Sequence, residues 1–249
     1  MLVIAGHDPA GAGLQADIET IAALGGRAST LVTCLTTQSS RGIAGMTPTP
    51  AALLLGQAAC LLNDIRPPAA CKIGLVPDLE TLRAVVQILA LLPSGTPIVV
   101  DPVLGAAAGG GVASAGLAEH FLSELLPKAT LCTPNMRELR RLAEVGGAGL
   151  QQVLKASPWC LAKGADEPGE TVVHQLFQDS RLYAEYRWPR IEGVFHGSGC
   201  MLASAISVLL AGGMTVAAAV AYGLSYTWRA LTNAFDPGGA QLLPSRPPL

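Results

Sequence analysis

Short apolar runs alternate with helix-like patterns along most of this chain, and that alternation limits the fold more than any other feature of the sequence. Apolar runs such as residues 2–5 and 98–101 are each followed by a longer stretch in which apolar side chains recur with helical spacing. Alternation of this kind predicts right-handed βαβ units and a largely parallel sheet, and therefore an α/β fold. The expected strands are residues 2–5, 30–35, 70–73, 98–101, 130–132 and 159–162, and the expected helices are residues 14–24, 50–63, 78–91, 114–125 and 136–144.

The pattern changes in the last third of the chain. Apolar runs at residues 172–177 and 182–186 lie too close together for a helix between them, so they predict an antiparallel hairpin. Residues 197–228 carry no formal charge and are long enough to span a membrane. Gly212-Gly213 divides this stretch, however, and its Ala, Ser and Gly content is less apolar than Leu or Ile would be. We expect a buried pair of helices and no membrane partner.

Length and charge favour one domain that binds a small molecule. The chain has 249 residues, half of them hydrophobic, which is enough to bury a substantial core. We expect a single domain over residues 1–235, followed by a Pro-rich and poorly ordered tail over residues 236–249. The formal net charge is −2 and like charges form no runs, which gives no footprint for nucleic acid.

The cysteines and the N-terminus indicate a reducing compartment. Six cysteines are present, but no two form a CxxC pair, so neither a zinc site nor a disulfide framework is expected. The chain enters an apolar strand at once, without the basic start, long apolar segment and cleavage site of a secretory signal. We therefore expect a cytoplasmic protein with free thiols.

The strongest local signal is the run His196-Gly197-Ser198-Gly199-Cys200, which leads directly into an expected helix. Glycines allow the backbone amides to turn inward, and together with the unpaired N–H groups of a helix start they form a cradle for an anion. The same field predicts a lowered pKa for the Cys200 thiol, which would let the thiolate take a proton from a substrate hydroxyl. An isolated motif of this kind is more often a structural turn with an inert thiol.

A second glycine-rich loop, Gly11-Ala12-Gly13, also leads into an expected helix. It does not complete the GxGxxG fingerprint of dinucleotide-binding proteins, because position 16 is alanine. A dehydrogenase is therefore disfavoured. Asp17 follows on the helix, where it would face a bound ligand and pair with an amine or hydroxyl, or else be an ordinary charge in the first turn.

Polar residues also follow three expected strands, at the edge of a parallel sheet where ligands bind. Asp101 and Glu138 are candidates for a magnesium site, since Mg²⁺ takes a few carboxylates together with phosphate oxygens and water. Lys163 is a candidate contact for a nucleotide phosphate. Thr133 and Asn135 lie at the same edge, and each of the five residues could instead be a turn or cap residue.

The chain resembles the hydroxymethylpyrimidine and phosphomethylpyrimidine kinases over about residues 2–231. The shared motifs, in the order of that family, are AGHDPAGAGLQAD, LTTQSSRG, KIGLV, DPVL, TPNMREL, the Lys163-Gly164 pair and HGSGC. The family belongs to the ribokinase-like superfamily, together with vitamin B6 kinases. The resemblance implies a three-layer α/β/α sandwich with a mostly parallel central sheet, Mg²⁺ and ATP as cofactors, and a homodimer. It also implies phosphorylation of 4-amino-5-hydroxymethyl-2-methylpyrimidine, and then of its monophosphate, in thiamine biosynthesis.

The resemblance assigns roles to individual residues. The anion hole would be Gly197, Ser198 and Gly199, with Cys200 as the base. Asp101 and Glu138 would serve the metal. The pyrimidine pocket would take Ala12, Asp17, Gln38, Leu75 and Val103, and the nucleotide would be bound by Thr133, Asn135 and Lys163.

The chain departs from the family pattern where phosphate is handled. Ala107-Ala108-Gly109 replaces a KSG segment, so a lysine expected over the phosphates is missing, and Lys163-Gly164-Ala165-Asp166 stands in place of KGGH. A substrate that already carries a phosphate needs cations, so phosphorylation of the monophosphate is the open question. Two alternatives stay open, namely a pyridoxal or pyridoxine kinase and a pyrimidine-binding protein without catalysis.

Overall fold

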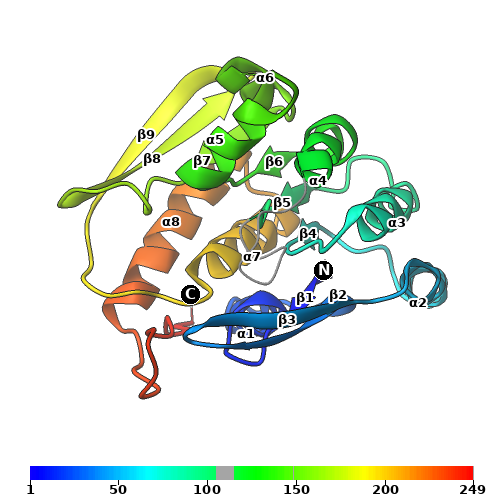
Figure 1. Ribbon diagram of the computed structural model, residues 1–249, viewed down its shortest axis with the longest axis horizontal. Helices are drawn as coiled ribbons and strands as arrows, with labels where there is room; N and C mark the ends of the chain where they lie inside the picture. Colours follow the sequence, from blue (N-terminus) through cyan, green and yellow to red (C-terminus); the bar gives the residue numbers. More distant parts are fainter. Residues whose placement is uncertain (105–114, 148, 249) are drawn as a thin grey trace.

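A single sheet runs through the protein, which is described by a computed structural model over residues 1–104, 115–147 and 149–248 (Figure 1). The strand order in this part of the chain is β3-β2-β1-β4-β5-β6-β7-β8-β9. The strands from β2 to β7 in this order are parallel, and β3, β8 and β9 join antiparallel at the two ends. Their bounds are β1 Leu2–His7, β2 Ser29–Ser39, β3 Gly42–Pro48, β4 Cys71–Ile73, β5 Ile98–Val100, β6 Leu131–Cys132, β7 Trp159–Ala162, β8 Thr171–Gln178 and β9 Arg181–Pro189.

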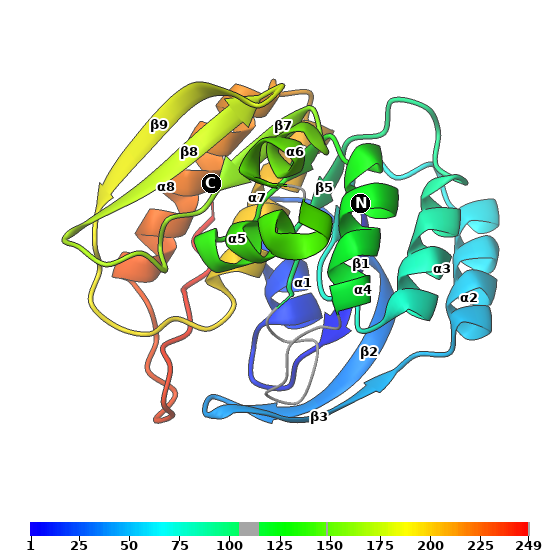
Figure 2. The same cartoon turned by 45° about the horizontal axis from the view of Figure 1, so that its top comes forward.

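Helices cover both faces of the sheet and complete three layers (Figure 2). One face carries α1 (Gly13–Ala23), α7 (Ser198–Ala211) and α8 (Val216–Thr232). The other face carries α2 (Ala51–Asp64), α3 (Leu79–Leu89), α4 (Ala115–His120), α5 (Met136–Glu144) and α6 (Gly149–Lys155). A π-helical turn at Phe121–Leu125 and a 3-10 turn at Leu126–Lys128 follow α4. The α/β fold expected from the alternation of apolar runs and helical patterns is confirmed.

The central strands are buried on both faces. On β1, Leu2 and Ile4 pack on the side of α2 and α3, while Val3 and Ala5 pack on the side of α1, and all four are fully buried. Burial of a large apolar side chain stabilises a fold by roughly 1.5–3 kcal/mol. Double-sided burial explains why these strands are continuous apolar runs rather than alternating ones.

Two elements were not predicted from the sequence. The edge strand β3 has the sequence GIAGMTP, with two glycines and few large apolar residues, and it forms by antiparallel pairing from Cys34↔Pro48 to Ser39↔Gly42. The helix α6 has only seven residues, which is too short for a clear helical period. Neither element changes the arrangement of the parallel core.

The uncharged stretch near the C-terminus forms the expected pair of helices. The first, α7, is buried along most of its length, and the chain turns at Gly212 and Gly213 before α8 begins. The two helices pack against each other, and α7 also contacts α1. Among the helices that the structure describes, none is both long and apolar enough to cross a membrane.

The C-terminal segment differs from the prediction of a poorly ordered tail. The amide of Leu243 donates to the carbonyl of Phe235 at 2.8 Å, and the amide of Phe235 donates in return at 2.7 Å. The amide of Leu242 donates to Val194 at 2.8 Å, and its carbonyl accepts from the amide of His196 at 2.9 Å. The prolines that suggested disorder flank two leucines, whose backbone groups bind this segment to the loop before α7.

Candidate functional site

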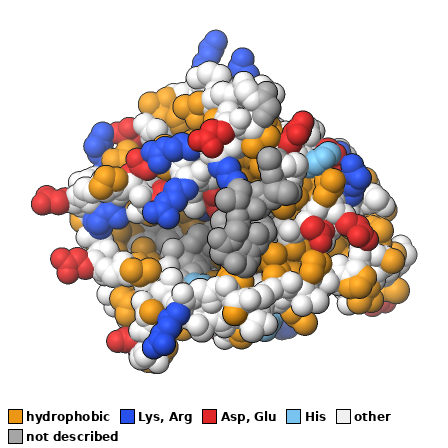
Figure 3. All heavy atoms as spheres, viewed as in Figure 1, with side chains coloured by type: hydrophobic (Ala, Val, Ile, Leu, Met, Phe, Trp, Pro, Cys, Tyr) orange, Lys and Arg blue, Asp and Glu red, His pale blue; other side chains and the backbone are white. Residues whose placement is uncertain are grey.

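A cavity of about 420 Å³ lies at the carboxyl edge of the parallel strands. It is walled by the loops that follow β1, β5, β6 and β7, by the β2–β3 hairpin and by the start of α7. Figure 3 shows one face of the molecule, on which Lys and Arg side chains are interspersed with Asp and Glu side chains. Twelve of the residues predicted for the site line this cavity, namely Ala12, Gln38, Leu75, Asp101, Val103, Asn135, Glu138, Lys163, Gly197, Ser198, Gly199 and Cys200.

The N-terminus of α7 opens into the cavity without a side-chain cap. Gly197 occupies the cap position with φ +80°, a left-handed conformation that favours glycine, and no side chain there accepts from the first amides of the helix. A Cβ atom at Gly197 would lie 3.0 Å from the Cα of Ala12, because the first glycine-rich loop packs against this turn. The absence of a cap and the positive helix end make this turn a candidate site for an anion.

An ion pair lies beside this helix start. The Lys163 Nζ is 2.6 Å from Asp101 Oδ1, and the Thr133 hydroxyl donates to the same oxygen at 2.9 Å. A Cβ added at Gly199 would be 3.3 Å from Lys163 Nζ and 3.6 Å from Asp101 Oδ2, so the pair borders α7 directly. Burial alone would raise the pKa of Asp101, but Lys163 and Lys72 hold it below its usual value. Thr133 is fully buried and supports Asp101 without lining the cavity.

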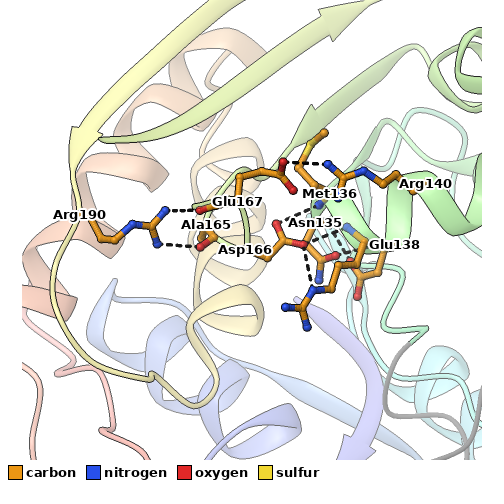
Figure 4. A network of polar contacts seen from close by, with 9 residues as sticks. Asn135, Met136, Glu138, Arg140, Ala165, Asp166, Glu167 and Arg190 are labelled. Carbon is orange, nitrogen blue, oxygen red and sulfur yellow. Dashed lines mark hydrogen bonds and ion pairs between the residues drawn. The ribbon is translucent and has the colours of Figure 1, made fainter. Parts of the chain in front are cut away.

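The N-terminus of α5 also faces the cavity, but it is capped (Figure 4). Asn135 Oδ1 accepts from the Glu138 amide and Glu138 Oε2 accepts from the Asn135 amide, both at 2.8 Å, which completes a capping box. Asp166 accepts from the amides of Met136 at 3.2 Å and Arg137 at 2.9 Å. Burial raises the pKa of Glu138 to about 7, and the charge of Asp101 adds to the rise.

The loop that carries Asp166 is itself held by neighbouring side chains (Figure 4). Arg190 donates to the carbonyl of Ala165 at 3.0 Å and also to the carbonyl of Glu167. The Glu167 carboxylate pairs with Arg140 on α5 at 2.8 Å. The sequence Lys163-Gly164-Ala165-Asp166, which departs from the family pattern, thus provides a carboxylate for the start of α5.

A second carboxylate contact at the cavity, between Asp8 and His196, was not predicted from the sequence. Asp8 Oδ2 lies 2.6 Å from His196 Nε2, and Asp8 Oδ1 accepts from the amide of Ala10 at 2.6 Å. The contact joins the first loop to the turn before α7, although the two residues lie 188 positions apart. Both flank glycine-rich motifs, which is the signal that could have identified them.

Asp17 does not lie where it was expected. It is fully buried beneath the cavity, where it accepts from Lys72 Nζ at 2.8 Å and from the Ser204 hydroxyl at 2.7 Å. It is not part of the cavity wall that the structure describes. The position is one turn into α1, and that face of the helix packs against α7 rather than facing the ligand side. Lys72, which the sequence reasoning also missed, stays an ammonium because the charges of Asp17 and Asp101 outweigh burial and raise its pKa.

The pKa of the Cys200 thiol is raised, not lowered as the sequence predicted. Burial raises the pKa of Cys200 to about 11, and the charges of Asp17 and Asp101 act in the same direction. Lys72 and the amide of Gly13 lower it, but by less. The helix field is therefore outweighed by desolvation and by two carboxylates, and the thiol is protonated near neutral pH.

Two cavity carboxylates could bind Mg²⁺, a cation that also keeps water molecules and phosphate oxygens as ligands. Within residues 1–104, 115–147 and 149–248, no group of three or more His, Cys, Asp or Glu side chains is arranged to hold a metal ion. Asp101 and Glu138 both line the cavity, and two carboxylates are a typical protein contribution to Mg²⁺ bound with phosphate. The predicted loss of a phosphate-binding lysine at Ala107-Ala108-Gly109 lies outside the described residues.

Known proteins with similar sequences are kinases. The profile of the phosphomethylpyrimidine kinases matches residues 8–244. The chain is 34% identical over 249 residues to a hydroxymethylpyrimidine/phosphomethylpyrimidine kinase of Streptomyces coelicolor, covering 96% of this chain and 91% of that one. It is 31% identical over 247 residues to a chloroplastic thiamine biosynthetic bifunctional enzyme of Arabidopsis thaliana, covering 95% of this chain and 47% of the relative.

The comparison with solved structures identifies the fold. The structure of the pyridoxal kinase from Staphylococcus aureus in complex with ADP has a TM-score of 0.87 at 24% identity, covering 98% of this chain and 92% of that one. This similarity confirms the ribokinase-like three-layer sandwich that the sequence motifs implied.

Proposed function

The chain belongs to the phosphomethylpyrimidine kinase family, and we propose that it transfers a phosphoryl group from ATP to the hydroxymethyl oxygen of 4-amino-5-hydroxymethyl-2-methylpyrimidine. The product monophosphate is then the acceptor of a second phosphoryl group, and both steps serve thiamine biosynthesis. The observation that carries the proposal is the uncapped start of α7, which opens into the cavity beside the Asp101–Lys163 pair.

The residues around the start of α7 suit phosphoryl transfer. The amides from Ser198 to Cys200 face the place where negative charge develops on the transferred group, and such fixed donors stabilise a transition state. Lys163 brings a positive charge to the same place. Phosphoryl transfer depends mainly on positioning and charge, so a protonated Cys200 thiol does not prevent it. We assign the role of proton acceptor to the thiolate form of Cys200, which forms when the thiol first releases its own proton to solvent and which then takes the hydroxyl proton as the new P–O bond forms.

The remaining cavity walls suit the acceptor and the donor. Leu75 and Val103 offer apolar contact to a flat ring, and the amide of Gln38 offers both a donor and an acceptor to an aminopyrimidine edge. Asn135 and Lys163 lie on the side where the nucleotide would bind. Asp101 and Glu138 would hold Mg²⁺, which neutralises phosphate charge when it is bound. Asp17 supports the site from below through Lys72 rather than by touching the ring.

Two other activities compete with this proposal. The likeness to a pyridoxal kinase structure, at 24% identity, makes pyridoxal the second acceptor to test. Pyridoxal also has a hydroxymethyl group on a nitrogen heterocycle, and Lys163 is a cavity lysine that could form a Schiff base with its aldehyde if it left Asp101. A pyrimidine-binding protein without catalysis would bind the ring but turn over no ATP.

One assay separates these possibilities. The purified protein is incubated with Mg²⁺ and ATP and either the free pyrimidine, its monophosphate, pyridoxal or no acceptor, and ADP release and product mass are followed. We expect ADP and a phosphorylated product with both pyrimidines. Product only with pyridoxal would replace the proposal, and acceptor-independent or absent turnover by folded protein would refute kinase activity.

The assembly and the location of the protein stay predictions. A homodimer is expected from the family resemblance, and light scattering coupled to size-exclusion chromatography measures the mass in solution. A cytoplasmic location is expected from the sequence, and fractionation of the source cells would check it.

A further inference from the structure

The turn of the β2–β3 hairpin places an arginine on the wall of the cavity. β2 ends at Ser39, β3 begins at Gly42, and Ser40 and Arg41 form the turn between them. Gln38, Ser40 and Arg41 all line the cavity. Arg41 lies in the LTTQSSRG motif, in which only Gln38 was given a role from the sequence.

Arg41 differs from the other permanent cation of the cavity wall in having no carboxylate partner among the residues that the structure describes. The described lining residues include three carboxylates, Asp8, Asp101 and Glu138, and two permanent cations, Lys163 and Arg41. Lys163 is paired with Asp101 at 2.6 Å. Within the described part of the chain, Arg41 has no ion-pair partner. A phosphate that entered this cavity would therefore meet mostly negative charge, and Arg41 is the lining cation that no carboxylate of the described residues already pairs with.

The hairpin turn is held in place by the C-terminal segment. The Ser40 hydroxyl accepts from the amide of Ala240 at 2.9 Å, and a Cβ at Gly239 would lie only 2.6 Å from that oxygen. Two residues on, Leu242 bonds to the backbone of Val194 and His196, immediately before the α7 start. The turn with Arg41 is thus linked through one short segment to the anion site, which restricts where the guanidinium can reach.

From these observations we infer that Arg41 binds the phosphate of the phosphorylated pyrimidine, and so determines whether the monophosphate is accepted as well as the free alcohol. A guanidinium offers several N–H donors in a planar fork that fits two phosphate oxygens. The inference rests on the proposed function and names the residue that replaces the missing lysine of the family pattern.

The test compares two acceptors in one variant. We expect Arg41→Ala to lower kcat/KM for the monophosphate at least about tenfold more than kcat/KM for the free pyrimidine, since a charged hydrogen bond is lost. The loss should appear mainly in KM, and the KM for ATP should not rise with it. Arg41→Lys should restore part of the difference, because it keeps the charge but not the fork.

Two further measurements make the test specific. Titration calorimetry with the pyrimidine monophosphate, without nucleotide, should show weaker binding by Arg41→Ala and no change by Arg66→Ala, an exposed arginine that does not line the cavity. Ser40→Ala, which removes the acceptor for Ala240, should shift the same ratio in the same direction by a smaller factor.

The outcomes separate this inference from the proposed function. If the wild type phosphorylates both pyrimidines and Arg41→Ala treats them alike, the assignment of Arg41 is wrong and the kinase proposal stands. If the wild type accepts the free pyrimidine alone, the assignment is again wrong and the first step stands. If the wild type phosphorylates neither, the proposed function itself fails.

Discussion

The two helices that begin at the cavity, α5 and α7, treat their N-terminal amides in opposite ways. Three side chains of the protein, Asn135, Glu138 and Asp166, accept from the first amides of α5 or complete its capping box. α7 begins at Gly197, where no side chain accepts from its first amides. Both helix starts attract negative charge. At α5 the protein supplies that charge itself, whereas the cap position of α7 has no accepting side chain and we expect a ligand to supply the charge there.

The residue at the start of a helix determines whether its first amides are bonded within the protein or remain open to a ligand. Good caps stabilise a helix at the start of α5, whereas glycine at the start of α7 gives up that stabilisation and keeps the amides accessible. The capped start nevertheless contributes to the site, because Glu138 lines the cavity and has a pKa raised to about 7. The four predictions below test the contrast, beginning with the largest expected effect.

Gly197→Ala should remove most of the activity. Alanine at φ +80° is strained by about 1–2 kcal/mol, and its Cβ would lie 3.0 Å from Ala12, so the turn must shift and move the amides. Loss of one such donor commonly lowers kcat by about a hundredfold or more. Steady-state kinetics with a thermal melt measures both effects. The control is Gly213→Ala, which has φ +86° and open space around it, and which should lose stability but keep kcat. Equal kinetics in both variants would refute the anion site.

Cys200→Ala should lower kcat at least about tenfold while the affinity for the pyrimidine stays nearly the same. The pKa of Cys200 is raised to about 11, so the thiolate fraction grows with pH through the neutral range. Log(kcat/KM) of the wild type should therefore rise by about one per pH unit between pH 7 and 9, and the variant should lose that slope. Cys60→Ala, at an exposed thiol on α2, serves as the control. A variant with the wild-type rate and slope would exclude Cys200 as proton acceptor.

Asn135→Ala should destabilise the protein by about 1 kcal/mol, because the cap of α5 is lost. The KM for ATP should also rise severalfold, since Asn135 and Glu138 line the cavity and we propose that they serve the nucleotide and its metal. The matched control is Asp78→Ala, which removes a comparable cap from α3, where Asp78 accepts from the Thr81 amide at 2.8 Å. Urea unfolding should show similar losses in the two variants. An unchanged KM for ATP in Asn135→Ala would restrict that residue to stability.

Asp166→Asn should have the smallest effect, a loss of about 0.5 kcal/mol in the free energy of unfolding. The amide keeps the shape of the side chain but removes the charge that faces the α5 amides. Glu167→Gln, at an exposed ion pair with Arg140, should change stability by less. Urea unfolding at low and high salt checks both variants, and the Asp166 effect should shrink at high salt. Equal effects in the two variants would show that the α5 start gains nothing from this carboxylate.

Most of the fold could be predicted from the sequence because the core is parallel. The strands of such a core are buried on both faces and therefore appear as short, separate apolar runs, as residues 98–101 do. β3 could not be predicted, since an edge strand with two glycines carries no pattern, and pairing with β2 forms it. The C-terminal segment was misjudged because proline suggests disorder, whereas the hydrogen bonds of Leu242 and Leu243 depend on distant partners.

The site was predicted where chain order and strand ends determine position. Asp101 follows β5 and Lys163 follows β7, with β6 between them, and both line the cavity at the predicted sheet edge; their direct ion pair was not predicted. Burial could not be inferred in the same way. The direction of Asp17 and the pKa of Cys200 both depend on how α1 packs against α7, which no local motif records. Arg41 lies in the LTTQSSRG motif, but it was given no role because the hairpin turn that brings it to the cavity was not predicted.

The buried pair of Asp17 and Lys72 has a consequence for how this protein can change over evolutionary time. Loss of one partner leaves an unpaired buried charge, which costs roughly 3–5 kcal/mol, a large part of the stability of a typical domain. A lineage that replaced one residue first would lose folded protein before the other could follow. We therefore expect the two positions to change together, and a chimera that takes α1 from one relative and β4 from another should fold only if both parents carry a matching pair.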